Sequence, residues 1–247
     1  MTFLQAVLLG IIQGLTEFFP VSSSAHLKLA RWFLGAPDDV IFDLVCHSGT
    51  LLALVWFLRK DVWEVLCSVR KMAFFTLALI PLVPGYFLLK PVREALSEPA
   101  FLGFALMGTG AILFAATKKK DVIEKKKWHH VLCIGMMQTM ALIPGISRSG
   151  STIAAARFCG WNWREAAKFS FLLAIPTILG GEALEWLKGS AASPVDWGCY
   201  VGGFAASFGL GSVGVRFIFW VYEQENLKPF AWYCIGLGLF AWAMFHG

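Results

Sequence analysis

Two short polar segments lie inside otherwise strongly apolar sequence, about 125 residues apart. The first runs from Gln13 to His26 and the second from Gln138 to Thr152, and each contains a glutamine, an apolar turn, a proline and a serine cluster. Polar groups at membrane depth are costly, so they are usually functional. We interpret the two segments as parts of one chemical site.

The second segment offers groups that bind an anion. Arg148 is a permanent cation whose planar fork of donors matches phosphate oxygens, and Ser147 and Ser149 add hydroxyl donors beside it. Pro144-Gly145 should end one helix, and a new helix should begin near Ser149–Thr152 with its N–H groups and positive dipole end free. These residue types predict a phosphate-binding site.

The first segment offers complementary groups for hydrolysis. Gln13 and Glu17 are four residues apart on one helix face, and His26 follows Ser22-Ser23-Ser24 at the start of a returning helix. A serine hydroxyl needs a neighbouring base to attack phosphorus, and either His26 or Glu17 could accept its proton. The carboxylate could instead hold a divalent cation that bridges diphosphate oxygens. Direct attack by water is an open alternative to attack by the serine.

Each of these residues also has a structural interpretation. Glu17 could form a structural ion pair with Arg148, His26 could be a packing histidine, and the serines could be helix N-caps. The functional interpretation is favoured because all these residue types occur at the two places where the apolar pattern breaks.

Other titratable groups receive structural interpretations. We interpret His47 and His129-His130 as local or interfacial, and Glu182 and Glu185, near a span end, as solvated. The six cysteines are scattered without metal-ligand or disulfide spacing, so we interpret them as small hydrophobic residues.

The composition places the chain in a bilayer. Apolar residues make up 57% and charged residues 15% of the sequence, against roughly 45–50% and about 25% in soluble domains. The net charge of +5 comes mostly from Lys118–Lys120 and Lys125–Lys127, and it indicates membrane topology rather than nucleic-acid binding. The N-terminus has no basic region or small-residue cleavage site, so we expect no removable signal peptide.

The apolar runs predict an all-α polytopic membrane protein with about six transmembrane helices and two re-entrant helix pairs. Each run is close to the roughly 20 residues that a spanning helix needs. The runs are 41–58, 73–89, 100–117, 165–185, 197–220 and 229–246. Segments 2–35 and 131–160 are apolar but interrupted, and such breaks survive only against protein or a water-filled cavity.

We expect a single integral membrane domain, 1–247, built as an inverted-topology repeat. The halves are approximately 1–117 and 131–247, joined by a basic cytoplasmic linker, 118–130. Each half has one re-entrant pair and three spans, and an odd number of spans inverts the second half. The basic loop 59–71 and the linker predict that both termini lie outside the cell.

These motifs resemble those of the bacterial undecaprenyl-diphosphate phosphatases of the bacitracin-resistance type. The segments Gln13–His26 and Pro144–Thr152 are similar to the two family signatures, Asp43–Thr50 is similar to a third family segment, and the resemblance covers the whole chain. It implies hydrolysis of undecaprenyl diphosphate to undecaprenyl phosphate and phosphate. That reaction recycles the lipid carrier for peptidoglycan synthesis and cell wall biogenesis at the bacterial inner (cytoplasmic) membrane.

The resemblance also implies roles for individual residues. The implied catalytic residues are Glu17, Ser23, His26 and Arg148, with Ser23 as nucleophile and His26 as its base; the implied substrate-binding residues are Gln13, Ser22, Ser147, Ser149 and Thr152. It ties Glu17 to a divalent cation, and hard oxygen ligands favour Mg²⁺ or Ca²⁺ over zinc. The chain departs from the family pattern at Gln13, where some members have glutamate, and at Ala25, often glycine.

The alternative function is a lipid flippase or secondary transporter that binds an anionic substrate in the same cavity without breaking a bond. A membrane hydrolase acting on another bond is a weaker alternative, because the arginine argues against a neutral amide. The expected partners are a polyprenyl diphosphate lipid and membrane lipids, with room for a homodimer and no nucleic acid.

Overall fold

The computed structural model describes residues 1–96, 98–118, 126–188 and 196–246, and these residues form helices, turns and irregular segments without a strand. The helices are α1 Phe3–Thr16, α2 Ser23–Leu34, α3 Val40–Phe57, α4 Arg59–Leu66, α5 Val69–Leu79, α6 Leu82–Leu88, α7 Lys90–Ala95, α8 Pro99–Thr117, α9 Trp128–Met140, α10 Arg148–Phe158, α11 Trp163–Leu187, α12 Trp197–Glu223 and α13 Lys228–His246.

Within the described ranges, five helical segments are long and apolar enough to cross a membrane. They are Val40–Phe57, Val69–Leu88, Pro99–Thr117, Trp163–Leu187 and Trp197–Glu223, and they match five of the six predicted runs. Helix α13 covers the sixth run. The short helices α4 and α7 follow spans and were not predicted from the sequence. The prediction of an all-α polytopic membrane protein is confirmed.

The two interrupted segments each form a pair of antiparallel helices. In the first pair, the Gln5 side chain at the start of α1 donates to the Leu34 carbonyl at the end of α2, at 2.9 Å. In the second pair, the Trp161 indole N–H, just after α10, donates to His130 at the start of α9, at 3.2 Å. The outer ends of each pair therefore lie together, as expected of a hairpin that enters and returns on one side.

Both hairpins pack against a neighbouring helix at backbone contact distance. A Cβ atom added at Gly10 of α1 would lie 2.4 Å from the carbonyl oxygen of Gly203 on α12, and one added at Gly135 of α9 would lie 2.4 Å from that of Ala78 on α5. Each of the two hairpin glycines lies three residues before the glutamine of its motif. This correspondence supports the division into two inverted halves, which stays a prediction.

Helix α10 is the most enclosed element near the site. Its residues from Ser149 to Arg157 are buried, and it packs against α8, α9 and α11. The small side chains of Ala154, Ala155 and Ala156 are fully buried and allow this close packing. The N-terminus of α10 is therefore held rigidly inside the bundle.

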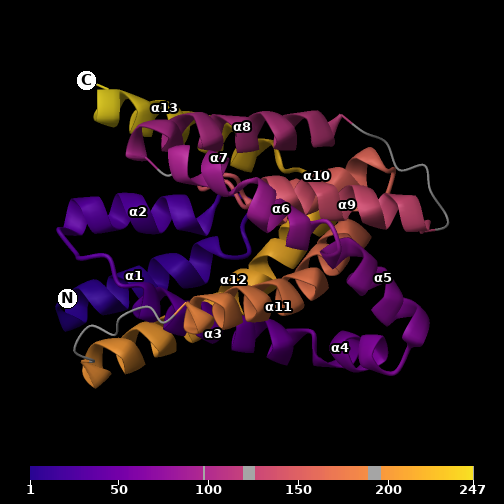
Figure 1. Cartoon of the computed structure of the whole chain (residues 1–247), viewed down its shortest axis with the longest axis horizontal. Coiled ribbons are helices and arrows are strands. Elements are labelled where there is room, and N and C mark those ends of the chain that lie inside the picture. Colours follow the sequence, from indigo (N-terminus) through magenta and orange to yellow (C-terminus); the bar gives the residue numbers. More distant parts are fainter. Residues whose placement is uncertain (97, 119–125, 189–195, 247) are drawn as a thin grey trace.

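The two chain ends lie at one end of the long axis of the molecule, and α4 lies at the other (Figure 1). At the α4 end, Lys168 of α11 pairs with Asp61 of α4, and Arg164 Nε lies 3.8 Å from Glu223 Oε1 of α12. The charged residues of three helices thus meet at this end. Its assignment to the cytoplasm stays a prediction.

The predicted loop 59–71 contains α4 and the start of α5. Residues 119–125 of the predicted linker 118–130 lie outside the described residues.

Candidate functional site

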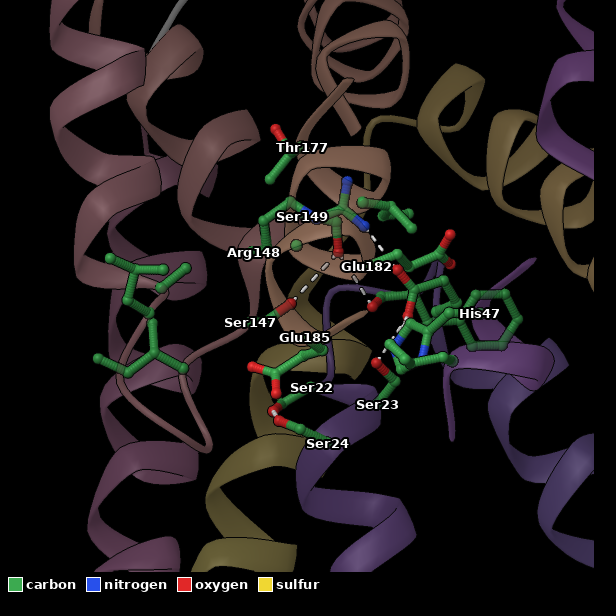
Figure 2. Close-up of a pocket in the computed structure, with 18 residues that line it drawn as sticks. Ser22, Ser23, Ser24, His47, Ser147, Arg148, Ser149, Thr177, Glu182 and Glu185 are labelled. Atoms are coloured by element: carbon green, nitrogen blue, oxygen red, sulfur yellow. Dashed lines mark hydrogen bonds and ion pairs between the residues drawn. The ribbon is translucent and has the colours of Figure 1, made fainter. Parts of the chain in front are cut away.

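A cavity of about 350 Å³ lies where the interruptions of the two hairpins meet (Figure 2). Its wall comes from the segment between α1 and α2, the start of α2, one face of α3, the turn between α9 and α10, and the C-terminal half of α11. The lining residues are Glu17, Phe19, Ser22, Ser23, Ser24, Leu44, His47, Ala141, Leu142, Ile146, Ser147, Arg148, Ser149, Thr177, Ile178, Gly181, Glu182 and Glu185.

The Glu17 carboxylate is the centre of a hydrogen-bond network. Glu17 directly follows α1 and is buried. Its Oε1 accepts from Arg148 Nη2 at 2.6 Å, and its Oε2 accepts from Ser23 Oγ at 2.8 Å and from Gln13 Nε2 at 2.9 Å. A buried carboxylate is tolerated only with such partners. The network joins the two hairpins through their most polar residues.

Arg148 is the first residue of α10, and its position is fixed from two sides. The Ser147 hydroxyl caps the helix by accepting from Gly150 N–H at 3.1 Å, while Ser147 N–H donates to Thr109 Oγ1 of α8 at 3.1 Å. Nη2 of the guanidinium binds Glu17, but Nη1 is buried without a partner. A buried, unpaired donor on a permanent cation fits an anionic oxygen such as that of a phosphate. Figure 2 shows the Arg148 side chain directed across the cavity, toward the side that holds Ser23.

Ser22, the residue directly before α2, lies in a strained turn. Ser22 has φ 68° and ψ 91°, a left-handed conformation that is uncommon for a residue other than glycine. Strain of this kind is often retained at functional sites. The turn directs Ser23 toward Glu17, and Ser22 Oγ lies 3.2 Å from Ser24 Oγ. Ser23 is thus a hydroxyl at a helix N-terminus, hydrogen-bonded to a carboxylate.

The structure brings most of the predicted site residues together. Glu17, Ser22, Ser23, Ser147, Arg148 and Ser149 line the cavity, and Gln13 contacts it through Glu17. The hairpins also touch through Ser149, whose hydroxyl donates to the Phe19 carbonyl at 3.2 Å. Thr152 lies one turn deeper in α10, where its hydroxyl donates to the Arg148 carbonyl at 2.9 Å and contacts Ser170 at 2.6 Å. Thr152 therefore supports the position of Arg148 from behind the cavity.

His26 lies elsewhere. Its Nδ1 is 2.8 Å from the Ser22 carbonyl, its Nε2 is 2.7 Å from the hydroxyl of Tyr233 on α13, and the two rings stack. Both ring nitrogens have partners other than Ser23, and His26 does not line the cavity. The geometry supports the structural interpretation of His26. Its hydrogen bond to the Ser22 carbonyl helps to hold the strained turn in place.

Other cavity residues were not predicted for the site. His47 Nε2 lies 3.7 Å from Glu17 Oε2, and Ser48 Oγ donates to Glu182 Oε1 at 3.2 Å. Glu182 and Glu185 line the cavity, and Glu185 is also partly exposed and paired with Lys188 at 2.5 Å. A signal was present for both groups: His47 lies inside the third family segment, and the two glutamates are three residues apart on an apolar helix.

The carboxylates of the cavity can be compared with the divalent cation that the sequence predicts. Glu17, Glu182 and Glu185 line the same space, while Arg148 is the permanent cation in that wall. Arg148 pairs with Glu17 and Lys188 pairs with Glu185, so Glu182 is the carboxylate of this wall whose charge a bound cation would neutralise. Among the residues that the structure describes, no three His, Cys, Asp or Glu side chains are arranged to hold a metal ion by themselves. The donor set fits a Mg²⁺ or Ca²⁺ ion held jointly by carboxylate and substrate oxygens, as is common for Mg²⁺.

These features define a multi-pass helical membrane protein whose two interrupted helix pairs enclose a charged, anion-receptive cavity. Comparison with known proteins gives the family. A family model described as bacitracin resistance protein BacA matches residues 6–240. The chain belongs to this family.

Curated relatives match almost the full length of the chain. It is 40% identical to an undecaprenyl-diphosphatase of Protochlamydia amoebophila, with 97% of each chain covered. It is 36% identical to an undecaprenyl-diphosphatase of Christiangramia forsetii, with 98% of this chain and 97% of the relative covered. A relative of the same name from Methanococcus vannielii is 34% identical, with 96% of this chain and 98% of the relative covered.

Proposed function

We propose that this protein hydrolyses undecaprenyl diphosphate to undecaprenyl phosphate and phosphate, and so recycles the lipid carrier for peptidoglycan synthesis. The observation that carries the proposal is the Arg148 guanidinium, which lines the same cavity as Ser23, binds Glu17 through Nη2 and has a buried Nη1 without a partner. Family membership and the names of the relatives support the same reaction. We place the protein in the inner (cytoplasmic) membrane of a bacterium as part of this proposal.

In the proposed first step, Ser23 Oγ attacks the terminal phosphorus of the diphosphate. The Oγ–P bond forms while the bridging P–O bond breaks, and the bridging oxygen leaves with its electron pair as part of undecaprenyl phosphate. The serine proton passes to Glu17 Oε2, which already accepts its hydrogen bond at 2.8 Å. Arg148 Nη1 neutralises charge on the transferring phosphoryl oxygens.

In the second step, water attacks the phosphorus of phosphorylated Ser23, and the Oγ–P bond breaks. Glu17 returns its proton to Ser23 Oγ, and the protons of the water remain with the released phosphate. The step restores Ser23 and Glu17 to their starting protonation states. A bound Mg²⁺ or Ca²⁺ would supply additional neutralisation of diphosphate charge. We propose Glu17 and Glu182 as the residues that would hold it, together with diphosphate oxygens.

The direct test is orthophosphate release from a C55 diphosphate by the purified protein in detergent, with and without a chelator. We expect release by the wild type in the presence of Mg²⁺ or Ca²⁺ and none from Glu17→Ala. Wild-type turnover in Glu17→Ala, with the variant folded, would defeat the proposed chemistry.

The flippase or transporter alternative predicts a different result from vesicles. A transporter would move labelled lipid diphosphate across the membrane without releasing orthophosphate, whereas the proposed enzyme releases it. The Glu17–Ser23 hydrogen bond favours hydrolysis, because anion translocation needs no activated hydroxyl. A homodimer is a further proposal, tested by the mass of the purified protein in lipid nanodiscs.

A further inference from the structure

The His47 ring contacts groups on either side of it. Its Nδ1 lies 2.7 Å from the Asp43 carbonyl oxygen, one turn earlier in α3. A carbonyl oxygen can only accept a hydrogen bond, so Nδ1 bears a hydrogen. The other ring nitrogen, Nε2, lies 3.7 Å from Glu17 Oε2. The contact with the main chain therefore fixes which nitrogen is presented to Glu17.

Helix α3 is held firmly behind this ring. A Cβ atom added at Gly49 would lie 2.2 Å from Ser207 Oγ and 2.9 Å from the Phe204 carbonyl oxygen, so α3 and α12 are in contact at backbone distance. The Thr50 hydroxyl donates to the His47 carbonyl at 2.8 Å. Rotation of α3 that would withdraw the ring from the cavity would break this packing.

Negative charge faces His47 from several elements. The carboxylates that interact with it electrostatically are Glu17 after α1, Asp43 on α3 itself and Glu182 on α11. Arg148 of α10 lies on the far side of Glu17, bound to the opposite carboxylate oxygen. A hydrogen on Nε2 can point at the Glu17 carboxylate, whereas a bare Nε2 would face an anionic oxygen with its lone pair.

We propose that His47, whose Nε2 faces Glu17 Oε2, is a positioning residue for the Glu17 carboxylate. Arg148 holds Oε1 and His47 attracts Oε2, so the carboxylate is fixed from both sides. In that orientation Oε2 receives the Ser23 hydroxyl and, in the first step, its proton. This role rests on the proposed function, since it concerns the residue that accepts the proton of the nucleophile.

The test compares His47→Leu with His47→Gln by steady-state phosphate release. Loss of correct positioning can cost about 10²-fold in rate, and we expect that loss in kcat for His47→Leu, with KM nearly unchanged. The glutamine amide N–H can replace Nε2–H, so His47→Gln should recover most of the activity.

His129→Leu, at the exposed start of α9, is the control and should match the wild type. Thermal unfolding in detergent reports whether each variant folds, and if His47→Leu does not fold, the kcat of His47→Gln relative to the wild type decides. Wild-type kcat in folded His47→Leu would overturn the positioning role. So would a folded His47→Gln as inactive as His47→Leu, because the imidazole would then itself transfer the proton. If the wild type released no phosphate, both the proposed function and this role of His47 would be rejected. That result differs from the two variant outcomes above, in which the wild type is active.

Discussion

Arg148 Nη2 and Glu17 Oε1 lie 2.6 Å apart, although 131 positions separate the two residues in the sequence. This ion pair joins the interruption of one hairpin to that of the other, and both partners are largely buried. Removing one partner of a buried pair leaves an uncompensated charge. The pair therefore joins the two hairpins and places a permanent cation beside Ser23, the nucleophile that we propose.

The geometry of the Arg148 fork can be tested with Arg148→Lys, which keeps the charge. Lysine cannot hold Glu17 and offer a second, fixed donor at the same time. Loss of one preorganised donor costs about 10²–10³-fold in kcat, and we expect a loss of that size in phosphate release. Arg164→Lys, at an exposed ion pair on α11, is the matched control and should retain activity. Equal turnover in the two variants would contradict the proposal that the Arg148 guanidinium binds the phosphate.

Ser23 as nucleophile predicts a phosphorylated enzyme. With substrate labelled in its terminal phosphate, acid quenching should trap label on the peptide that contains Ser23, and Ser23→Ala should abolish both label and turnover. Ser24→Ala should still form the adduct, because Ser24 contacts Ser22 and not Glu17. Turnover by Ser23→Ala without any label would indicate direct attack by water.

The acidic wall of the cavity predicts a dependence on divalent cations. A chelator should stop phosphate release, and Mg²⁺ or Ca²⁺ should restore it. Glu182→Gln should raise the Mg²⁺ concentration needed for half-maximal activity, because one carboxylate ligand is lost. Glu165→Gln, on the same helix but paired with Lys126 at 3.3 Å, should not. Full activity in the presence of chelator would contradict a requirement for a divalent cation.

The close approach of α1 and α12 predicts a specific loss of stability. In Gly10→Ala the new methyl group would meet the Gly203 carbonyl, since an added Cβ lies only 2.4 Å from it. Overpacking of this kind typically costs about 1–3 kcal/mol, so we expect a lower melting temperature in detergent. Gly209→Ala on α12 is the control, because an added Cβ there meets nothing within 4 Å. Equal melting temperatures would show that α1 can move away from α12 at little cost.

Most of the site was predictable because its residues interrupt an apolar pattern. Glu17, Ser23 and Arg148 lie beside the prolines that break the two hairpins, and polar residues there have few structural uses. The meeting of the breaks also followed from physical chemistry, since exposed backbone polar groups need partners at membrane depth.

The rest depended on helix rotation, which the sequence does not determine. His47 and Glu182 lie within regular, strongly apolar helices, and their direction depends on how α3 and α11 pack. His26 is close to Ser23 in sequence, but its ring direction depends on Tyr233, 207 positions away on α13. The sequence pattern therefore predicts which residues lie together at the breaks in the hairpins. It does not predict which side chains on different helices of the bundle face each other.

The volume of the cavity has a consequence for selectivity. About 350 Å³ is at the small end of the range for ligand pockets, enough for the charged head of a lipid and too little for a tail of fifty-five carbons. The tail must stay among the acyl chains of the membrane, where one prenyl unit more or fewer changes little at the reacting phosphorus. The cavity itself can therefore select the phosphorylated end of an isoprenoid but not the length of its tail.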